Sequence, residues 1–321
     1  MAQVYVTSTS FMQGCPDAIK ALEERGYELR VNPTGKPMEG MDLITALSGC
    51  VGVIAGLDRY DGAIIEDLSG VRAISRYGVG LDNVDLNAAT KAGIVVTFTP
   101  GANTEAVADL AFALMMAAAR GIVKVDTMTR SGGWPKFLGS SVWGKTIGIV
   151  GTGAIGRAFA RRLAGFSVKM LLFDIRQDVD FALSIGGEYV AFDRLLAESD
   201  FISLHVPLNS ATKGLIGPMQ LAMMKPSSYL INTARGGIVD EDALADAIEE
   251  GKIAGAALDV FLHEPPVGSR LAKSDKVVIT PHMGSHTKEA VAAMGMMAAR
   301  NLIDALDGKM PQHTANPEVY R

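Results

Sequence analysis

Short apolar, β-branched runs alternate with helical segments along most of the chain, and this alternation limits the possible folds more than any other feature. Strands are predicted at 4–7, 27–31, 51–54, 71–74 and 94–97, with helices at 17–25 and 82–92 among those between them. Strands separated by helices indicate βαβ units, whose strands run parallel beneath covering helices. The sequence therefore predicts an α/β protein built on doubly wound parallel sheets.

The pattern is interrupted after residue 99. The segment 100–104 breaks it, and Asn103 or Thr104 can cap the helix predicted at 105–120, which is apolar almost all round and should be covered on both sides. The alternation restarts with strands at 146–150, 168–173, 201–204, 229–232, 255–260 and 277–280, and the chain closes with a helix at 288–306 and a polar tail. Because 321 residues exceed what one core usually organises, we expect two α/β domains joined near residue 101.

Composition excludes several classes of protein. A net charge of -5 and a pI near 5.6 argue against a nucleic-acid partner. The most apolar run, 110–119, has ten residues, whereas a bilayer requires about twenty, so neither a membrane span nor a targeting segment is expected. Two cysteines can form neither a disulfide framework nor a cysteine-rich zinc site. We expect a cytoplasmic protein without a metal.

An apolar strand at 146–150 ends in a glycine run, Gly151, Gly153 and Gly156, and a helix follows. In this context the first glycine permits a tight turn, the second lets a pyrophosphate approach the backbone, and the third lets helix and strand pack closely. Asp174 lies 18 residues after Gly156, at the end of the next strand, where a carboxylate can bind a ribose 2′-hydroxyl and repel a 2′-phosphate. The pattern predicts NAD rather than NADP, although the nearby Arg176 could blur that choice. The alternative is an ordinary glycine-rich turn.

Polar residues follow several strands at the edge where a parallel sheet binds its ligands. Arg235 follows strand 229–232, Glu264 follows strand 255–260 and His282 follows strand 277–280. Hydride transfer between a hydroxy acid and a nicotinamide needs a cation for the carboxylate, an acid–base group near neutrality and a carboxylate to orient that group. These three residues can fill those roles.

Each of these residues also has an ordinary structural alternative. Arg235 could cap a loop, Glu264 could sit in an exposed acidic turn, and His263 or His282 could be a core histidine. His205, after strand 201–204, is a weaker candidate for the cofactor cleft. The remaining histidines are interpreted as structural (His263 and His286) or as part of the tail (His313).

Five motifs in order resemble the NAD-dependent D-2-hydroxyacid dehydrogenases, and within them the 3-phosphoglycerate dehydrogenase branch, and the resemblance covers nearly the whole chain. They are Ser75-Arg-Tyr-Gly-Val-Gly-Leu-Asp-Asn-Val-Asp85, Gly151-Thr-Gly-Ala-Ile-Gly156, Asn232-Thr-Ala-Arg-Gly-Gly-Ile-Val-Asp240, Asp259-Val-Phe-Leu-His-Glu-Pro265 and Thr280-Pro-His-Met-Gly-Ser285. The resemblance implies that Arg235, Glu264 and His282 form a catalytic trio, with His282 as acid–base. It also implies that the backbone of Gly78, Val79 and Gly80 binds the substrate carboxylate together with Arg235.

The resemblance further implies cofactor contacts and a domain plan. The cofactor would be lined by Val79, Ala154, Ile155, Asp174, Pro207, Thr233, Ala234, Asp259 and Gly284, to which the glycine run (Gly151, Gly153, Gly156), His205 and His282 are added. Residues 1–101 and 288–321 would form a flavodoxin-like substrate domain, and residues 102–287 a Rossmann NAD-binding domain. The helix 105–120 and the loop containing Trp134 resemble a dimerisation element, which implies a homodimer.

The sequence departs from the family pattern at informative positions. His263 stands where an acidic residue is usual, Gly56 stands where an arginine for a substrate phosphate is expected, and no regulatory domain is expected after Arg321. Arg59 and Arg76 are the remaining candidates for a phosphate-binding cation, with a solvated surface arginine as the alternative for each. Two other functions stay open: formate or phosphite oxidation on the same scaffold, although formate enzymes carry glutamine in place of Glu264, and an NAD-sensing corepressor.

Overall fold

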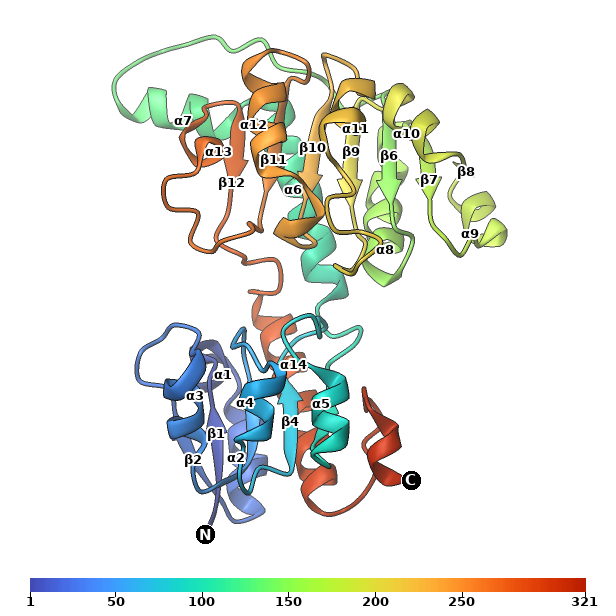
Figure 1. The fold of residues 1–321 in the computed structure, drawn as a ribbon. Coiled ribbons are helices and arrows are strands. Elements are labelled where there is room, and N and C mark those ends of the chain that lie inside the picture. The colour runs from blue at the N-terminus through green and yellow to red at the C-terminus, as the bar shows by residue number, and fades with distance from the viewer. The chain divides into compact units, whose positions relative to one another are not determined.

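The computed structural model describes residues 1–321, apart from the side chain of Thr9, as two compact units (Figure 1). Unit 1 comprises Met1–Asn103 and Ser285–Arg321, and unit 2 comprises Thr104–Gly284. Unit 1 is therefore assembled from two segments that are far apart in the sequence. The assignment of substrate and NAD-binding roles to the two parts of the chain stays a prediction.

Unit 1 is a five-stranded parallel sheet with the strand order β2-β1-β3-β4-β5. Its strands are β1 (Ala2–Val6), β2 (Tyr27–Val31), β3 (Cys50–Ala55), β4 (Ala73–Arg76) and β5 (Val95–Thr97). Because side chains alternate along a strand, Val4 and Val6 pack with one group of helices, α1 (Thr9–Gly14), α2 (Pro16–Glu24) and α14 (Lys288–Leu306). Tyr5 packs with the other group, α3 (Gly40–Leu47), α4 (Gly62–Glu66) and α5 (Leu86–Lys91).

The C-terminal tail, which ends in the short helix η3 (Pro317–Tyr320), is docked against the edge strand β5. Ala315 N donates to Val96 O at 2.7 Å, and Thr314 pairs antiparallel with Thr97. Asn316 is 2% exposed. Its Oδ1 accepts from Val96 N and its Nδ2 donates to Ile94 O, both at 2.8 Å. The sequence predicts only a polar tail here. In the structure this tail provides hydrogen-bond partners for the edge strand β5.

Unit 2 is a seven-stranded parallel sheet with the order β12-β11-β10-β9-β6-β7-β8. Its strands are β6 (Thr146–Val150), β7 (Lys169–Phe173), β8 (Gly187–Tyr189), β9 (Phe201–Leu204), β10 (Tyr229–Asn232), β11 (Gly255–Leu258) and β12 (Val277–Ile279). The order reverses between β6 and β9, so the glycine turn after β6 lies at the switch point where such sheets bind ligands. The predicted fold class is confirmed.

Helices cover both faces of this sheet (Figure 1). On one face pack α6 (Thr104–Arg120) and α8 (Ala154–Arg162), with the short helix η1 (Leu163–Phe166); on the other pack α10 (Phe192–Glu198), α11 (Pro218–Met223) and α12 (Glu241–Glu249). The remaining helices are α7 (Ile122–Arg130), α9 (Val179–Ser184), α13 (Arg270–Lys273) and η2 (Gly236–Ile238). Among the described residues no single helix is long and apolar enough to span a membrane; α6 and α7, bent by 64°, meet the criterion only as a pair.

We predict that Asn316→Ala destabilises unit 1 by about 1–3 kcal/mol, because it leaves the buried Val96 amide and the Ile94 carbonyl without these partners. Urea titration followed by far-ultraviolet circular dichroism measures the change. The matched control is Gln312→Ala, at an exposed position of the same tail, which should leave the unfolding midpoint unchanged. Equal midpoints for wild type and Asn316→Ala would show that the tail does not stabilise the edge.

Candidate functional site

The turn after β6 is built from glycines that differ in what surrounds them. Gly151 has φ +95°, and a Cβ atom there would lie 2.6 Å from His205 O. A Cβ at Gly156 would lie 2.0 Å from Gly151 O. At Gly153, which caps α8, a Cβ would meet no described atom within 4 Å. The fold thus requires the first and last glycines, whereas the middle one leaves open space at the helix N-terminus.

Asp174, directly after β7, is tied to this turn by hydrogen bonds. Its Oδ2 accepts from Thr152 N at 2.6 Å and from Thr152 Oγ1 at 3.2 Å, and its Oδ1 accepts from Arg176 N at 2.9 Å. Burial raises the pKa of Asp174, but these backbone and hydroxyl donors outweigh it and hold the pKa below its ordinary value. The carboxylate is therefore ionised and fixed beside the glycine turn, while Arg176 contributes its backbone.

His205 supports the glycine turn from the end of β9. Its Nε2 lies 2.9 Å from Ser203 Oγ, and its ring packs at 5.1 Å from that of Phe159. Its backbone N donates to Val150 O at 2.7 Å. Burial lowers the pKa of His205 to about 3, so the imidazole is neutral near pH 7 and supports the turn without exchanging protons.

The carboxyl edge of the sheet fits a dinucleotide. Thr233, after β10, is buried, and its Oγ1 has no hydrogen-bond partner among the described residues, so it can bond to a ligand. Gly153 leaves room at the N-terminus of α8, and Asp174 offers an ionised acceptor. The other predicted contacts of unit 2 follow strands on the same edge: Ala154, Ile155, Pro207, Ala234, Asp259 and Gly284.

Arg235 lies in a turn that the buried side chain of Asn232 stabilises through hydrogen bonds. The buried Asn232 side chain accepts from Ala234 N at 3.0 Å and donates to Arg235 O at 2.9 Å. The Arg235 guanidinium donates to Ala234 O at 2.7 Å. A Cβ at Gly236 would lie 2.0 Å from the carbonyl carbon of Phe261. The arginine turn is therefore in direct backbone contact with the loop that carries Glu264.

Glu264 and His282 form a hydrogen-bonded pair. Glu264 Oε2 lies 2.8 Å from His282 Nδ1, and Oε1 accepts from Phe261 N at 3.0 Å. Burial raises the pKa of Glu264, but the bond with His282, the Phe261 amide and the charge of Arg235 outweigh it and lower the pKa below its usual value. An ionised carboxylate thus orients the imidazole through Nδ1, and Nε2 is the ring nitrogen that Glu264 does not engage.

The turn that carries His282 is held in an unusual backbone conformation. His282 has φ +51°, a left-handed region that few non-glycine residues adopt. Its N donates to Asp259 O at 2.8 Å and to Thr280 O at 3.1 Å. The buried Asp259 carboxylate accepts from Thr280 Oγ1 at 2.6 Å and from the amides of Met283 and Gly284, each at 2.9 Å. Strain maintained by so many contacts is typical of functional positions.

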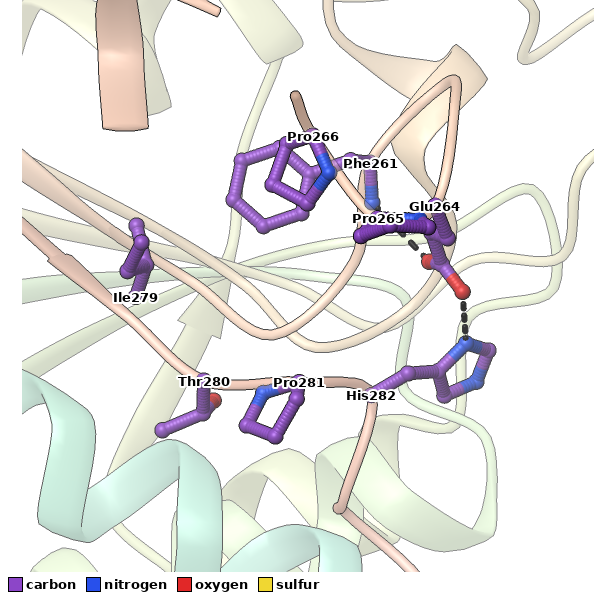
Figure 2. A pocket seen from close by; sticks show the side chains of 8 residues that line it. All are labelled: Phe261, Glu264, Pro265, Pro266, Ile279, Thr280, Pro281 and His282. Carbon is purple, nitrogen blue, oxygen red and sulfur yellow. Dashed lines mark hydrogen bonds and ion pairs between the residues drawn. The ribbon is translucent and has the colours of Figure 1, made fainter. Parts of the chain in front are cut away.

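This pair forms the polar wall of a cavity of about 290 Å³, and Figure 2 shows the side chains that line it. The rest of the lining is mostly apolar and comes from the loop after β11 and from the end of β12. The lining residues are Phe261, Glu264, Pro265, Pro266, Ile279, Thr280, Pro281 and His282. The Glu264–His282 pair therefore has the mostly apolar cavity on one side and belongs to the polar residues that follow the strands of unit 2.

Comparison with known proteins identifies the family. A model of the "D-isomer specific 2-hydroxyacid dehydrogenase, NAD binding domain" matches residues 112–284. The chain is 44% identical over 311 residues to a glyoxylate reductase of Thermococcus litoralis, covering 92% of each chain. This protein belongs to the D-isomer specific 2-hydroxyacid dehydrogenase family. It is an NAD-dependent oxidoreductase of small 2-hydroxy acids and 2-oxo acids, as the sequence predicts.

Solved structures of other dehydrogenases and reductases have the same fold as this chain over nearly its whole length. A glyoxylate reductase from Paecilomyes thermophila superimposes with a TM-score of 0.86 at 31% identity, covering 98% of both chains. A D-lactate dehydrogenase from Aquifex aeolicus, complexed with NAD and lactic acid, gives a TM-score of 0.86 at 27% identity, covering 97% of this chain and 98% of that one. NAD is thus the cofactor of this family in a matching fold.

Unit 1 of the dehydrogenase carries the predicted carboxylate-binding backbone, Gly78–Gly80, one residue after the end of β4. Arg76 lies beneath it and is 4% exposed. Its Nε donates to Gly80 O at 3.1 Å and its Nη1 to Ala55 O at 3.0 Å. The alternative of a solvated Arg76 is wrong, because the guanidinium is buried and binds backbone carbonyls. Arg59 is a surface residue: its side chain is 71% exposed and its Nε lies 3.6 Å from Asp61 Oδ2.

The remaining histidines correct one expectation. His263 and His286 are exposed, so the alternative of a core histidine is wrong for His263. His313 packs its ring 6.4 Å from that of Phe98 and accepts from Phe98 N through its carbonyl. The site-organising roles of Asn232 and Thr152 were missed. Their only signal in the sequence is a short polar side chain at a strand end, where it can bond to backbone amides.

We predict opposite behaviour for alanine at two glycines of the same turn. Gly156→Ala should lower the melting temperature by several degrees, because its Cβ would collide with a backbone oxygen. Gly153→Ala should keep the wild-type melting temperature but weaken NADH binding by about tenfold, ~1.4 kcal/mol. Thermal unfolding and isothermal titration with NADH measure the two effects. Unchanged NADH affinity in Gly153→Ala would remove that glycine from the phosphate site.

Proposed function

We propose that this dehydrogenase reduces glyoxylate, or a 2-oxo acid of similar size, with NADH. The observation that carries the proposal is the Glu264–His282 pair at 2.8 Å, on the same sheet edge as Arg235. The similarity to glyoxylate reductases such as that of Thermococcus litoralis supports the choice of substrate. Formate oxidation is disfavoured, since Glu264 stands where formate enzymes of this scaffold carry glutamine.

Each member of the proposed catalytic trio has a distinct role. The planar guanidinium of Arg235 holds the substrate carboxylate in two-point fashion and polarises the neighbouring carbonyl. Glu264 stabilises the protonated imidazole through Nδ1, and His282 delivers its proton from Nε2 to the carbonyl oxygen. Bound NADH supplies the hydride. In the reverse direction His282 removes the hydroxyl proton.

The residues proposed to bind the cofactor fall into groups that contact different parts of NADH. The glycine turn and the first residues of α8 (Ala154, Ile155) bind the pyrophosphate, and Asp174 binds the ribose. Val79, His205, Pro207, Thr233, Ala234, Asp259, His282 and Gly284 are proposed for the remaining contacts. His205 and Asp259 act by holding the turns that make contact, because their polar atoms are already bonded within the protein.

The carboxylate is proposed to bind the backbone of Gly78, Val79 and Gly80. These residues suit an anion, because the buried cation of Arg76 lies beneath them and fixes Gly80 through its carbonyl. A side chain at Gly78 would also crowd this cation, since a Cβ there would lie 3.3 Å from Arg76 Nη2. Arg76 is therefore proposed to support the carboxylate site rather than to bind a second anion.

A phosphorylated substrate is disfavoured. About two further negative charges would require a second cation, and the 3-phosphoglycerate branch was expected to provide one after β3. Gly56 occupies that position, Arg59 is exposed beside Asp61, and Arg76 is committed to backbone carbonyls. These observations favour a glyoxylate reductase over a 3-phosphoglycerate dehydrogenase.

We also propose a cytoplasmic homodimer. Large apolar side chains are exposed along α7 and the loop that follows it, a pattern typical of protein interfaces. Leu138 is 98% exposed and Trp134 86% exposed, with Ile122, Val123 and Met128 nearby in sequence. Both cysteines, Cys15 and Cys50, are free, as is usual in a reducing compartment.

We predict that Glu264→Gln moves the alkaline limb of the pH–rate profile for reduction to lower pH, because the imidazolium loses its anionic partner. His282→Ala removes the proposed acid–base group and should lower kcat by about 10²–10⁴-fold with nearly unchanged NADH affinity. Steady-state rates from pH 5 to pH 9 test both. An unmoved profile in Glu264→Gln removes Glu264 from its role, and wild-type turnover in His282→Ala removes His282.

We predict that kcat/KM for glyoxylate exceeds that for 3-phosphohydroxypyruvate by at least about tenfold, ~1.4 kcal/mol, because Gly56 supplies no cation and Arg59 is exposed beside Asp61. NADH oxidation with both substrates and with pyruvate measures the preference. Arg59→Ala is the control: it should leave kcat/KM for glyoxylate unchanged. A preference for the phosphorylated acid that Arg59→Ala abolishes would instead favour the 3-phosphoglycerate branch.

A further inference from the structure

Two carboxylates bind consecutive amides of the loop that carries Glu264. Glu264 Oε1 accepts from Phe261 N at 3.0 Å, and Glu241 Oε1 accepts from Leu262 N at 2.5 Å. The first bond is internal to the loop, whereas the second comes from α12. Leu262 lies only two residues before Glu264. The position of the Glu264 carboxylate is thus linked to the start of α12.

Glu241 is not needed to cap its own helix. The N-cap of α12 is Asp240, whose Oδ1 accepts from Ala243 N at 3.0 Å. Glu241 instead directs its carboxylate to the neighbouring loop. Burial raises the pKa of Glu241, and the charges of Asp242 and Glu264 add to this, while His263 opposes it. A partly buried carboxylate among like charges needs its amide donor to offset that cost.

We propose that Glu241 is a positioning residue for the catalytic pair: by holding Leu262 N it fixes the loop in which Glu264 reaches His282 Nδ1. This inference rests on the proposed function of the pair. Gly236 strengthens the link, because the arginine turn and the loop are in backbone contact there and α12 follows the arginine turn in the sequence. The segment from Arg235 to Glu241 therefore supports the Glu264 loop at two points.

The first test replaces the acceptor without shortening the side chain. Glu241→Met should lower kcat for glyoxylate reduction by about 3–10-fold, within the coupling range of contacting residues, with KM for NADH unchanged. Glu241→Gln, whose amide oxygen can still accept from Leu262 N, should lose less than about twofold. Asp242→Ala removes the same charge from an exposed position of the same helical turn and serves as the matched control, with wild-type kcat. Glu241→Ala replaces Glu241→Met if that variant is not recovered folded.

A double-mutant cycle decides whether Glu241 acts through Glu264. In a Glu264→Ala background, the second substitution Glu241→Met should cause no further loss of kcat, because the group it positions is absent. Multiplicative losses, or a Glu241→Gln variant as slow as Glu241→Met, would overturn the positioning role while leaving the proposed function intact. Wild-type kcat and an unmoved pH profile in Glu264→Ala would overturn the proposed function itself, and the positioning role with it.

Discussion

The carboxyl edge of the seven-stranded sheet depends on backbone segments that approach too closely for any side chain. A Cβ at Gly156 or Gly236 would lie 2.0 Å from a neighbouring backbone atom, and one at Gly151 would lie 2.6 Å from His205 O. These contacts place the glycine turn after β6 against the end of β9. They also place the arginine turn against the loop that carries Glu264. Because interiors are densely packed, such contacts leave each turn little freedom. The positions of the polar side chains in the candidate site thus depend on glycines, which have no side chain of their own.

Carboxylates then hold these turns in place. Asp174 binds amides beside the glycine turn, Asp259 binds the amides that follow His282, and Glu241 binds Leu262 N. Charge-assisted bonds to backbone amides are stronger than neutral ones. They therefore fix loop geometry better than packing alone does, and the protein uses them where its functional side chains must be aimed. Asp259 shows the result most clearly, since it maintains His282 at φ +51°.

The fold class and the candidate residues could be predicted from the sequence because both follow from local patterns. Periodicity located every strand except the short edge strand β8 within one or two residues, and strand ends suggested Arg235, Glu264 and His282. Short helices such as α3 and α4 were missed, since a helix of about two turns or fewer carries little periodicity. The bonds of Glu241 and Asn316 join residues 21 and up to 226 positions apart, and no local pattern records such contacts. Burial of Arg76 was likewise missed, because its partners are carbonyls that every residue carries.

The docking of the C-terminal tail on β5 has a consequence for biosynthesis. Unit 1 needs Ser285–Arg321 for helix α14 and for the bonds of Asn316 to its edge strand, whereas unit 2 is one continuous segment, Thr104–Gly284. During vectorial synthesis domains generally fold as units. The second unit can therefore acquire its native structure while the first still lacks its longest helix. The first unit, although it emerges from the ribosome earlier, is the last to be completed.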